Sequence, residues 1–79
     1  MTIDAYGVRK LLEKVSPGVD WSAVGPADSL EEAGLDSLDK ASFFLEVETA
    51  TGVKIPDAVY EEIDTIDGVI AAVGRCRPG

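Results

Sequence analysis

The sequence of 79 residues contains no histidine and a single cysteine, Cys76. A zinc site built from cysteine and histidine and an internal disulfide are therefore both excluded. Residues 28–39 lack the alternating oxygen ligands and central glycine of a calcium loop, so we expect no metal site. The absence of histidine also removes the usual base of a nucleophilic serine, which argues against a serine hydrolase. Nothing indicates an oxidising compartment, and we expect the protein in the cytoplasm.

Basic residues are few: 7 Lys and Arg stand against 15 Asp and Glu, giving a formal net charge of -8. A nucleic-acid backbone requires clustered Lys and Arg, so nucleic acid is not an expected partner. No apolar segment approaches membrane-spanning length, and we expect no membrane partner. An acidic surface attracts basic proteins and speeds their encounter, although solvation alone explains the excess of acid equally well.

Aromatic residues make up only 6% of the chain, whereas hydrophobic residues make up 46%. Aliphatic side chains must therefore fill most of the core. A chain of this length has apolar material for one core only. We therefore expect a monomeric protein with a single domain over residues 1–79, ordered over about 3–74 with a tail at 75–79.

Apolar residues recur at helical spacing, which predicts an all-α fold. The first helix is predicted over 3–15, with Thr2 as its N-cap and Arg9 on its charged face. A long loop over 16–36 follows, and a capping box at Ser29 predicts a short helical turn within it. The apolar residues expected to anchor this loop in the core are Trp21, Val24 and Leu30.

Three further helices are expected. The second runs over 37–51 and ends at Gly52, and a short third helix covers 58–63 after Pro56. The last is capped by Thr65 and ends at Gly74. Its predicted buried stripe consists of Ile66, Val69, Ile70 and Val73. The acidic residues interpreted as a solvated patch before and within it are Glu61, Glu62, Asp64 and Asp67.

The predicted helix 37–51 carries two apolar stripes. The stripe expected to face the core consists of Phe43, Phe44, Val47 and Thr51. The second stripe begins beside Ser37 and consists of Leu38, Ala41 and Leu45. One stripe suffices to fold so small a domain, so we expect the second to face a partner protein. The alternative is that Leu38 closes the core under the loop.

Residues 34–39 (Gly-Leu-Asp-Ser-Leu-Asp) place Ser37 at the start of this helix, where a hydroxyl can cap the helix or be modified. Lys40 could serve as its base only if desolvated, which nothing in the sequence indicates. Asp36 and Asp39 could form a catalytic pair, but acids are favoured at a helix start on structural grounds. The N–H groups of a helix start suit a phosphodiester on Ser37, with both acids orienting a metal or a basic enzyme during attachment.

These segments resemble the family of acyl carrier proteins and peptidyl carrier proteins, whose signature is Asp-Ser-Leu at the start of the second helix. The residues that carry the resemblance are 34–39, 55–57 (Ile-Pro-Asp) and 65–66 (Thr-Ile). The resemblance implies an acyl-carrier-like four-helix bundle with a long first loop and a short third helix. It also implies a non-catalytic carrier in which Ser37 receives phosphopantetheine from coenzyme A and holds an acyl, polyketide or aminoacyl cargo as a thioester.

The resemblance also implies partners. They are a phosphopantetheinyl transferase, an acyl- or aminoacyl-loading ligase or acyltransferase, and a ketosynthase, condensation or other tailoring enzyme. By the same resemblance the second helix is the main docking face. The contacts expected on it are Asp36, Leu38, Asp39, Ala41, Leu45 and Glu48.

The chain departs from fatty-acid carriers where those usually hold glutamates, at Ser42, Thr49 and Ala50. Lys40 adds a positive charge, and Phe43 and Phe44 are bulkier than the usual aliphatics, which would reduce an internal acyl pocket. We therefore expect a specialised polyketide or nonribosomal peptide pathway, with primary fatty-acid synthesis as the alternative. A second alternative is an unmodified interaction module, in which Ser37 is only a cap and the second stripe binds a partner helix.

Overall fold

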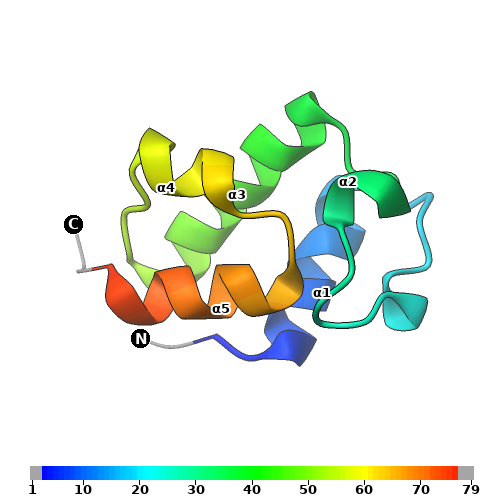
Figure 1. The fold of residues 1–79 in the computed structure, drawn as a ribbon, viewed down its shortest axis with the longest axis horizontal. Coiled ribbons are helices and arrows are strands. Elements are labelled where there is room, and N and C mark those ends of the chain that lie inside the picture. Colours follow the sequence, from blue (N-terminus) through cyan, green and yellow to red (C-terminus); the bar gives the residue numbers. More distant parts are fainter. Residues whose placement is uncertain (1–2, 77–79) are drawn as a thin grey trace.

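The computed structural model describes residues 3–76, which form five α-helices and one turn of 3₁₀-helix (Figure 1). The elements in chain order are α1 (Ala5–Val15), η1 (Trp21–Ala23), α2 (Leu30–Ala33), α3 (Ser37–Thr51), α4 (Asp57–Glu62) and α5 (Ile66–Arg75). No β-strand occurs within 3–76, so the predicted all-α fold is confirmed. The four predicted helices correspond to α1, α3, α4 and α5, and α2 is the short turn predicted inside the long loop.

The core forms where α1 packs against both α3 and α5. Its buried apolar residues make up one cluster, to which α4 contributes only the half-buried Val59 and Tyr60. The three predicted loop anchors, Trp21, Val24 and Leu30, are all buried in this cluster. The loop between α1 and α3 is therefore tied to the core by its own side chains, which keeps the approach to α3 in a fixed place.

Helix α1 begins two residues later than predicted. Asp4 is its N-cap, because the Asp4 carboxylate accepts a hydrogen bond of 2.8 Å from the backbone N–H of Gly7. The predicted start at residue 3 is therefore wrong, and Thr2, the predicted cap, lies outside the described residues. The predicted end is confirmed, since Ser16 follows the last helical residue.

The two last helices differ from the prediction by one residue at their ends. Helix α4 begins and ends one residue early, because Pro56 is its N-cap and Ile63 leaves the helix to enter the core. Helix α5 is capped by Thr65 as predicted, but it continues through Gly74 to Arg75. A glycine weakens a helix interior without necessarily ending it.

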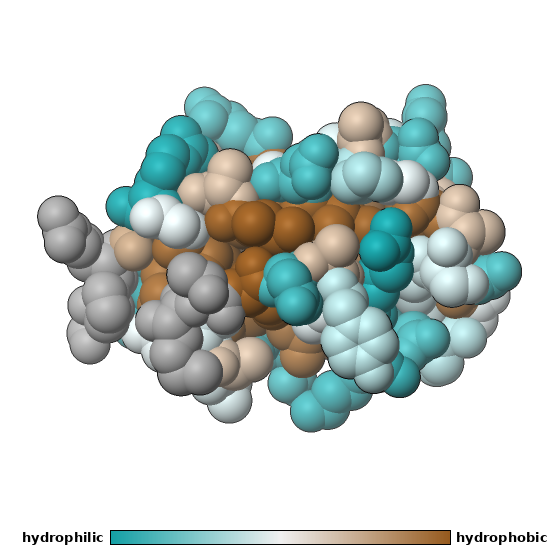
Figure 2. Space-filling model, turned by 90° about the horizontal axis from the view of Figure 1, so that it is seen from below, coloured by the Kyte–Doolittle hydropathy of each residue, from teal (hydrophilic) through white to brown (hydrophobic). Residues whose placement is uncertain are grey.

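The face of the molecule on which α5 lies carries a band of apolar side chains, bordered by hydrophilic ones (Figure 2). Ile66, Val69 and Val73 of α5 are buried as predicted. Ile70 was expected in the same stripe but is only half-buried, whereas Ala72 is fully buried. The buried stripe of α5 is thus rotated toward Ala72, whose small side chain permits close packing against the core.

Polar contacts also fix the long loop. The Arg9 guanidinium donates to the carbonyl oxygens of Trp21, at 3.3 Å, and Val24, at 2.9 Å. The backbone N–H of Asp67 donates to the carbonyl oxygen of Pro26 at 3.0 Å. Arg9 therefore does not belong to a purely solvated face of α1, as the sequence pattern suggested, but links that helix to the loop.

Candidate functional site

Two residues deliver Ser37 to the surface at the start of α3. Gly34 ends α2 with a φ of 128°, in a region that side chains disfavour, and a Cβ added there would lie 2.8 Å from the Val19 side chain. Leu35 follows and is buried, which fixes the chain to the core. The next two residues, Asp36 and Ser37, are exposed. The chain thus turns at Gly34, is held in the core by Leu35 and exposes Ser37 at the surface.

Ser37 does not cap α3. Asp36 is the N-cap, and its carboxylate accepts a hydrogen bond of 2.8 Å from the backbone N–H of Asp39. Ser37 is the first residue of the helix, and its hydroxyl makes no hydrogen bond within residues 3–76. The interpretation of Ser37 as a mere cap is therefore wrong, because the preceding aspartate is the N-cap and accepts the hydrogen bond from the Asp39 N–H.

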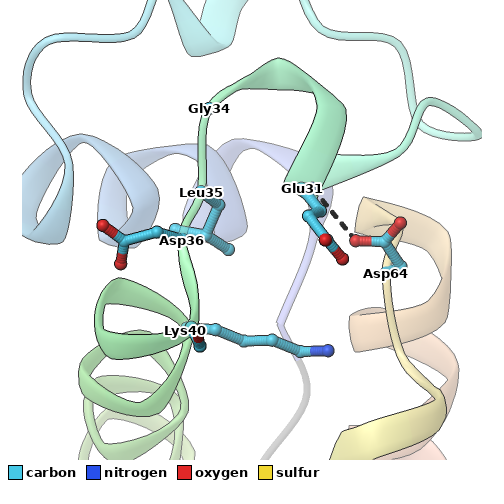
Figure 3. Close-up of a pocket in the computed structure, with 7 residues that line it drawn as sticks. Glu31, Gly34, Leu35, Asp36, Lys40 and Asp64 are labelled. Atoms are coloured by element: carbon cyan, nitrogen blue, oxygen red, sulfur yellow. Dashed lines mark hydrogen bonds between the residues drawn. The ribbon is translucent and has the colours of Figure 1, made fainter.

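Ser37 opens onto a hollow of about 430 Å³, which we call the serine hollow (Figure 3). Its walls come from α2, the start of α3 and the connection between α4 and α5. The lining residues are Glu31, Gly34, Leu35, Asp36, Ser37, Lys40 and Asp64. Three of these side chains are carboxylates, and Lys40 is the single cation among them.

Asp64 holds one wall of the serine hollow in place. Its carboxylate accepts a hydrogen bond of 3.0 Å from the backbone N–H of Glu31 (Figure 3). The same carboxylate also accepts a hydrogen bond from the Ser29 hydroxyl. Its backbone carbonyl accepts a bond of 2.8 Å from the N–H of Leu30. The assignment of Asp64 to a solvated patch is therefore wrong, because the side chain is half-buried and engaged by α2.

Lys40 lies on the same side of α3 as the serine hollow and is half-buried. Its ammonium lies 5.6 Å from the centroid of the Tyr60 ring. In Figure 3 the side chain extends across the hollow toward the side where Glu31 and Asp64 lie. Within residues 3–76, however, Lys40 forms no ion pair: the two salt bridges of this range join other residues.

The two apolar stripes of α3 have different surroundings. The stripe predicted to face the core is buried throughout and consists of Phe43, Phe44, Val47 and Thr51. The second stripe lies on the surface: Leu38 is 82% exposed, Leu45 is 65% exposed and Ala41 is exposed as well. The alternative in which Leu38 closes the core is therefore wrong. The second stripe is therefore not part of the buried core cluster.

The remaining predicted contacts, Asp39 and Glu48, are half-buried. The Glu48 carboxylate accepts a hydrogen bond of 2.9 Å from the backbone N–H of Ile55, so this side chain holds the connection between α3 and α4. Nothing in the sequence pattern marked that structural contact, because it depends on how the connection folds back against α3.

A second hollow, of about 260 Å³, lies between α3 and α4, and its lining includes Phe44 and Tyr60. The Phe44 ring packs edge-on against Phe43 and Tyr60, with ring centroids 5.1 and 4.9 Å apart. Two packed aromatic rings, Phe44 and Tyr60, thus form part of the wall of this hollow.

No group of three residues able to hold a metal ion occurs within residues 3–76, so Asp36 and Asp39 have no third ligand in that part of the chain. In the same range, the helices are all too short or too polar to cross a membrane.

The profile of the family described as "Phosphopantetheine attachment site" matches residues 8–73. An acyl carrier protein of Rubrobacter xylanophilus is 41% identical over 54 residues, which are 67% of this chain and 67% of that protein. The mitochondrial acyl carrier protein of Dictyostelium discoideum is 37% identical over 77 residues, 98% of this chain and 58% of the relative. An acyl carrier protein of Thermotoga maritima is 35% identical over 59 residues, 73% of each chain.

Proposed function

This chain belongs to the acyl carrier protein family, and we propose that Ser37 is the residue that bears its phosphopantetheine. The protein is a carrier and not an enzyme. When attached, the prosthetic group supplies a thiol that holds the cargo as a thioester, while catalysis belongs to partner enzymes. The chain itself contributes a serine, the position of that serine and a surface that partners recognise. An unmodified interaction module does not describe a member of this family.

The serines of the matched segment 8–73 differ in their availability. They are Ser16, Ser22, Ser29, Ser37 and Ser42. Ser16 is buried, and the hydroxyls of Ser22 and Ser29 each donate to a carboxylate. Only Ser37 and Ser42 are exposed and free of such a bond within residues 3–76, and both lie on α3. The candidate attachment sites are therefore Ser37, at the start of α3, and Ser42, further along the same helix.

The surroundings of Ser37 suit a phosphodiester. Backbone N–H groups in the first turn of a helix lack partners inside the helix and favour an attached anion. Asp36 caps α3, and the Ser37 hydroxyl has no hydrogen-bond partner in the described part of the chain, 3–76; this is the observation that carries the proposal. The serine hollow offers space beside it, and Lys40 supplies a positive charge. Ser42 lies further along α3 and does not line that hollow.

Intact mass tests the assignment. After incubation with coenzyme A and a phosphopantetheinyl transferase of broad specificity, the wild-type mass should rise by one phosphopantetheine. Ser37→Ala should show no gain, whereas Ser42→Ala, a matched exposed serine on the same helix, should gain as the wild type does. A gain that persists in Ser37→Ala, or a folded wild type that gains nothing, would count against the assignment.

We also propose that the transferase and the acyl-handling enzymes dock on the exposed side of α3. The supporting observation is the row of Leu38, Ala41 and Leu45 directly beside Ser37, with Asp36 and Asp39 next to it. An apolar row bordered by acids suits partners with a basic rim around an apolar centre. Loading enzymes and tailoring enzymes such as a ketosynthase or a condensation enzyme are the partner classes proposed.

For the cargo, we propose a specialised pathway of the polyketide or nonribosomal peptide type, with primary fatty-acid synthesis as the alternative. The support comes from three positions of α3 at which fatty-acid carriers usually hold glutamates and this chain does not. All three are exposed here: Ser42, Thr49 and Ala50. The relatives are named as acyl carrier proteins, and their names specify no pathway. The thioester released from holo protein purified from its own cells would identify the cargo.

We further propose that residues 1–79 form one monomeric carrier domain that acts in the cytoplasm. The support for one domain is that the buried apolar residues of 3–76 form a single cluster. The one cysteine, Cys76, fits a compartment in which disulfides do not form.

A further inference from the structure

Among residues 3–76, Lys40 is the only cation that lines the serine hollow. We propose that the Lys40 ammonium binds the phosphodiester carried by Ser37 and holds the near end of the arm over that hollow. This makes Lys40 a positioning residue for the arm. The proposal rests on attachment of the arm at Ser37 and adds a residue that fixes the direction in which the arm leaves α3.

The spacing along α3 permits the contact. Residues three apart on a helix are surface neighbours, with Cβ atoms about 5–6 Å apart. A long side chain in a helix leans toward the N-terminus and covers the turn before its own Cα. In the structure the Lys40 side chain extends across the hollow, with its ammonium 5.6 Å from the centroid of the Tyr60 ring. Its flexible stem can turn back over the first turn of α3 and bring the ammonium to a phosphate on the Ser37 oxygen. Both residues line the same hollow.

The charges around the hollow give this cation a specific task. A phosphodiester on Ser37 adds a negative charge beside the carboxylates of Glu31, Asp36 and Asp64, which repel it. Asp36 and Asp64 are already held by backbone N–H groups, so neither can turn away freely. Without Lys40 the hollow would repel the arm, and with it one positive charge faces the phosphate.

Lys40 is also available for this contact. Within residues 3–76 it forms no ion pair, and its ammonium lies 5.6 Å from the centroid of the Tyr60 ring. That distance is near the outer limit of a cation–π contact, so little is lost when the ammonium moves. The ion pair between Lys40 and the phosphate would be partly exposed. Such a pair should increase the population of the docked arm by a factor of roughly two to five over that of an arm without it.

Phosphorus NMR of the holo protein tests the proposal. An arm held by Lys40 moves less than a free arm and should give a broader phosphodiester signal. Lys40→Gln should narrow this signal, because the population of the docked arm falls by a factor of roughly two to five. Lys40→Arg keeps the positive charge and should restore the broad signal. Lys54→Gln is the matched control, because Lys54 is exposed on the connection after α3 and does not line the hollow.

Wild-type holo protein gives a second measurement that needs no variant. Salt screens a partly exposed ion pair, so the phosphodiester signal should narrow as ionic strength rises. An unchanged signal in Lys40→Gln would overturn the proposal. Equal narrowing of the signal in Lys54→Gln would also overturn it, as would a wild-type line width that does not change with ionic strength. If Lys40→Gln alters only transfer to a partner enzyme, Lys40 contacts the partner and the proposal is wrong.

The mass measurement separates this proposal from the assignment of Ser37. A wild-type protein that gains no phosphopantetheine at Ser37 overturns the assignment itself. A protein that is modified at Ser37 but shows no dependence on Lys40 overturns only the role of Lys40.

Discussion

The carboxylate of Asp64 accepts a hydrogen bond of 3.0 Å from the backbone N–H of Glu31, which lies 33 residues earlier in the chain. The same carboxylate accepts from the Ser29 hydroxyl, and the Asp64 carbonyl accepts from the N–H of Leu30. One residue between α4 and α5 therefore receives three donors from the start of α2. This junction fixes one wall of the hollow beside Ser37, so the site depends on a residue distant from it in sequence.

Replacing Asp64 should destabilise the protein. Asp64→Ala leaves the Ser29 hydroxyl and the Glu31 N–H without their acceptor, and we expect the free energy of unfolding to fall by about 1–3 kcal/mol. Urea denaturation would measure it. Glu61→Ala, an exposed position on α4, is the control and should change stability by less than about 0.5 kcal/mol. Equal effects at both positions would show that the hydrogen bonds of Asp64 contribute nothing specific.

The start and end of α3 were predictable because their signals are local. Asp36 and Gly52 lie at the two ends of a segment with helical periodicity, and the structure gives Asp36 as the N-cap and Gly52 in the left-handed conformation with a φ of 70°. The exposure of Leu38 and Leu45 was also predictable from helical periodicity. The helix carries two apolar stripes, and one stripe is enough for the core.

Asp64 and Arg9 were misassigned because their contacts are made between segments far apart in the chain. Arg9 bonds to carbonyls 12 and 15 residues later, and its charge alone suggested solvation. No periodicity or capping rule records which backbone groups a fold will leave without partners. The same holds for Lys40, whose place in the serine hollow depends on α2 and on the connection between α4 and α5.

Substitutions at Asp36 should separate its structural role from its charge. Asp36→Ala removes the cap of α3 and should lower stability by about 1 kcal/mol, whereas Asp36→Asn keeps a capping oxygen and should stay close to the wild type. Thermal denaturation would show this order. Ser37→Ala, by comparison, should cost less than about 0.5 kcal/mol because its hydroxyl caps nothing. A Ser37→Ala loss as large as that of Asp36→Ala would contradict the assignment of the cap.

The rate of modification adds information about Asp36. If its charge guides the transferase, Asp36→Asn should be modified more slowly than the wild type at low salt, and the difference should shrink as salt rises. Intact mass followed over time would measure both rates. Equal rates at every salt concentration would limit Asp36 to its role as a cap.

Leu45 and Leu12 offer the same substitution in opposite surroundings. Leu12→Ala empties a fully buried position and should lower stability by about 2–5 kcal/mol, whereas Leu45→Ala, at a side chain that is 65% exposed, should change it by less than about 0.5 kcal/mol. Leu45→Glu should instead slow transfer of cargo to partner enzymes, since a charge is placed in an apolar docking row. Full transfer activity in Leu45→Glu would remove Leu45 from the docking surface.

Glu48 was predicted as a docking contact, yet its carboxylate accepts a hydrogen bond of 2.9 Å from the N–H of Ile55. The two roles respond differently to two substitutions. Glu48→Gln keeps an oxygen that can accept from Ile55 and removes the charge, whereas Glu48→Ala removes both. If the contact is structural, Glu48→Ala should lose about 1 kcal/mol of stability and Glu48→Gln much less.

If the charge of Glu48 also contacts a basic partner, transfer of cargo should slow in Glu48→Gln although its stability is preserved, and the slowing should fade at high salt. Urea denaturation and transfer rates measured on the same three proteins decide the question, because a stable Glu48→Gln with unchanged transfer would confine Glu48 to the junction of α3 and α4.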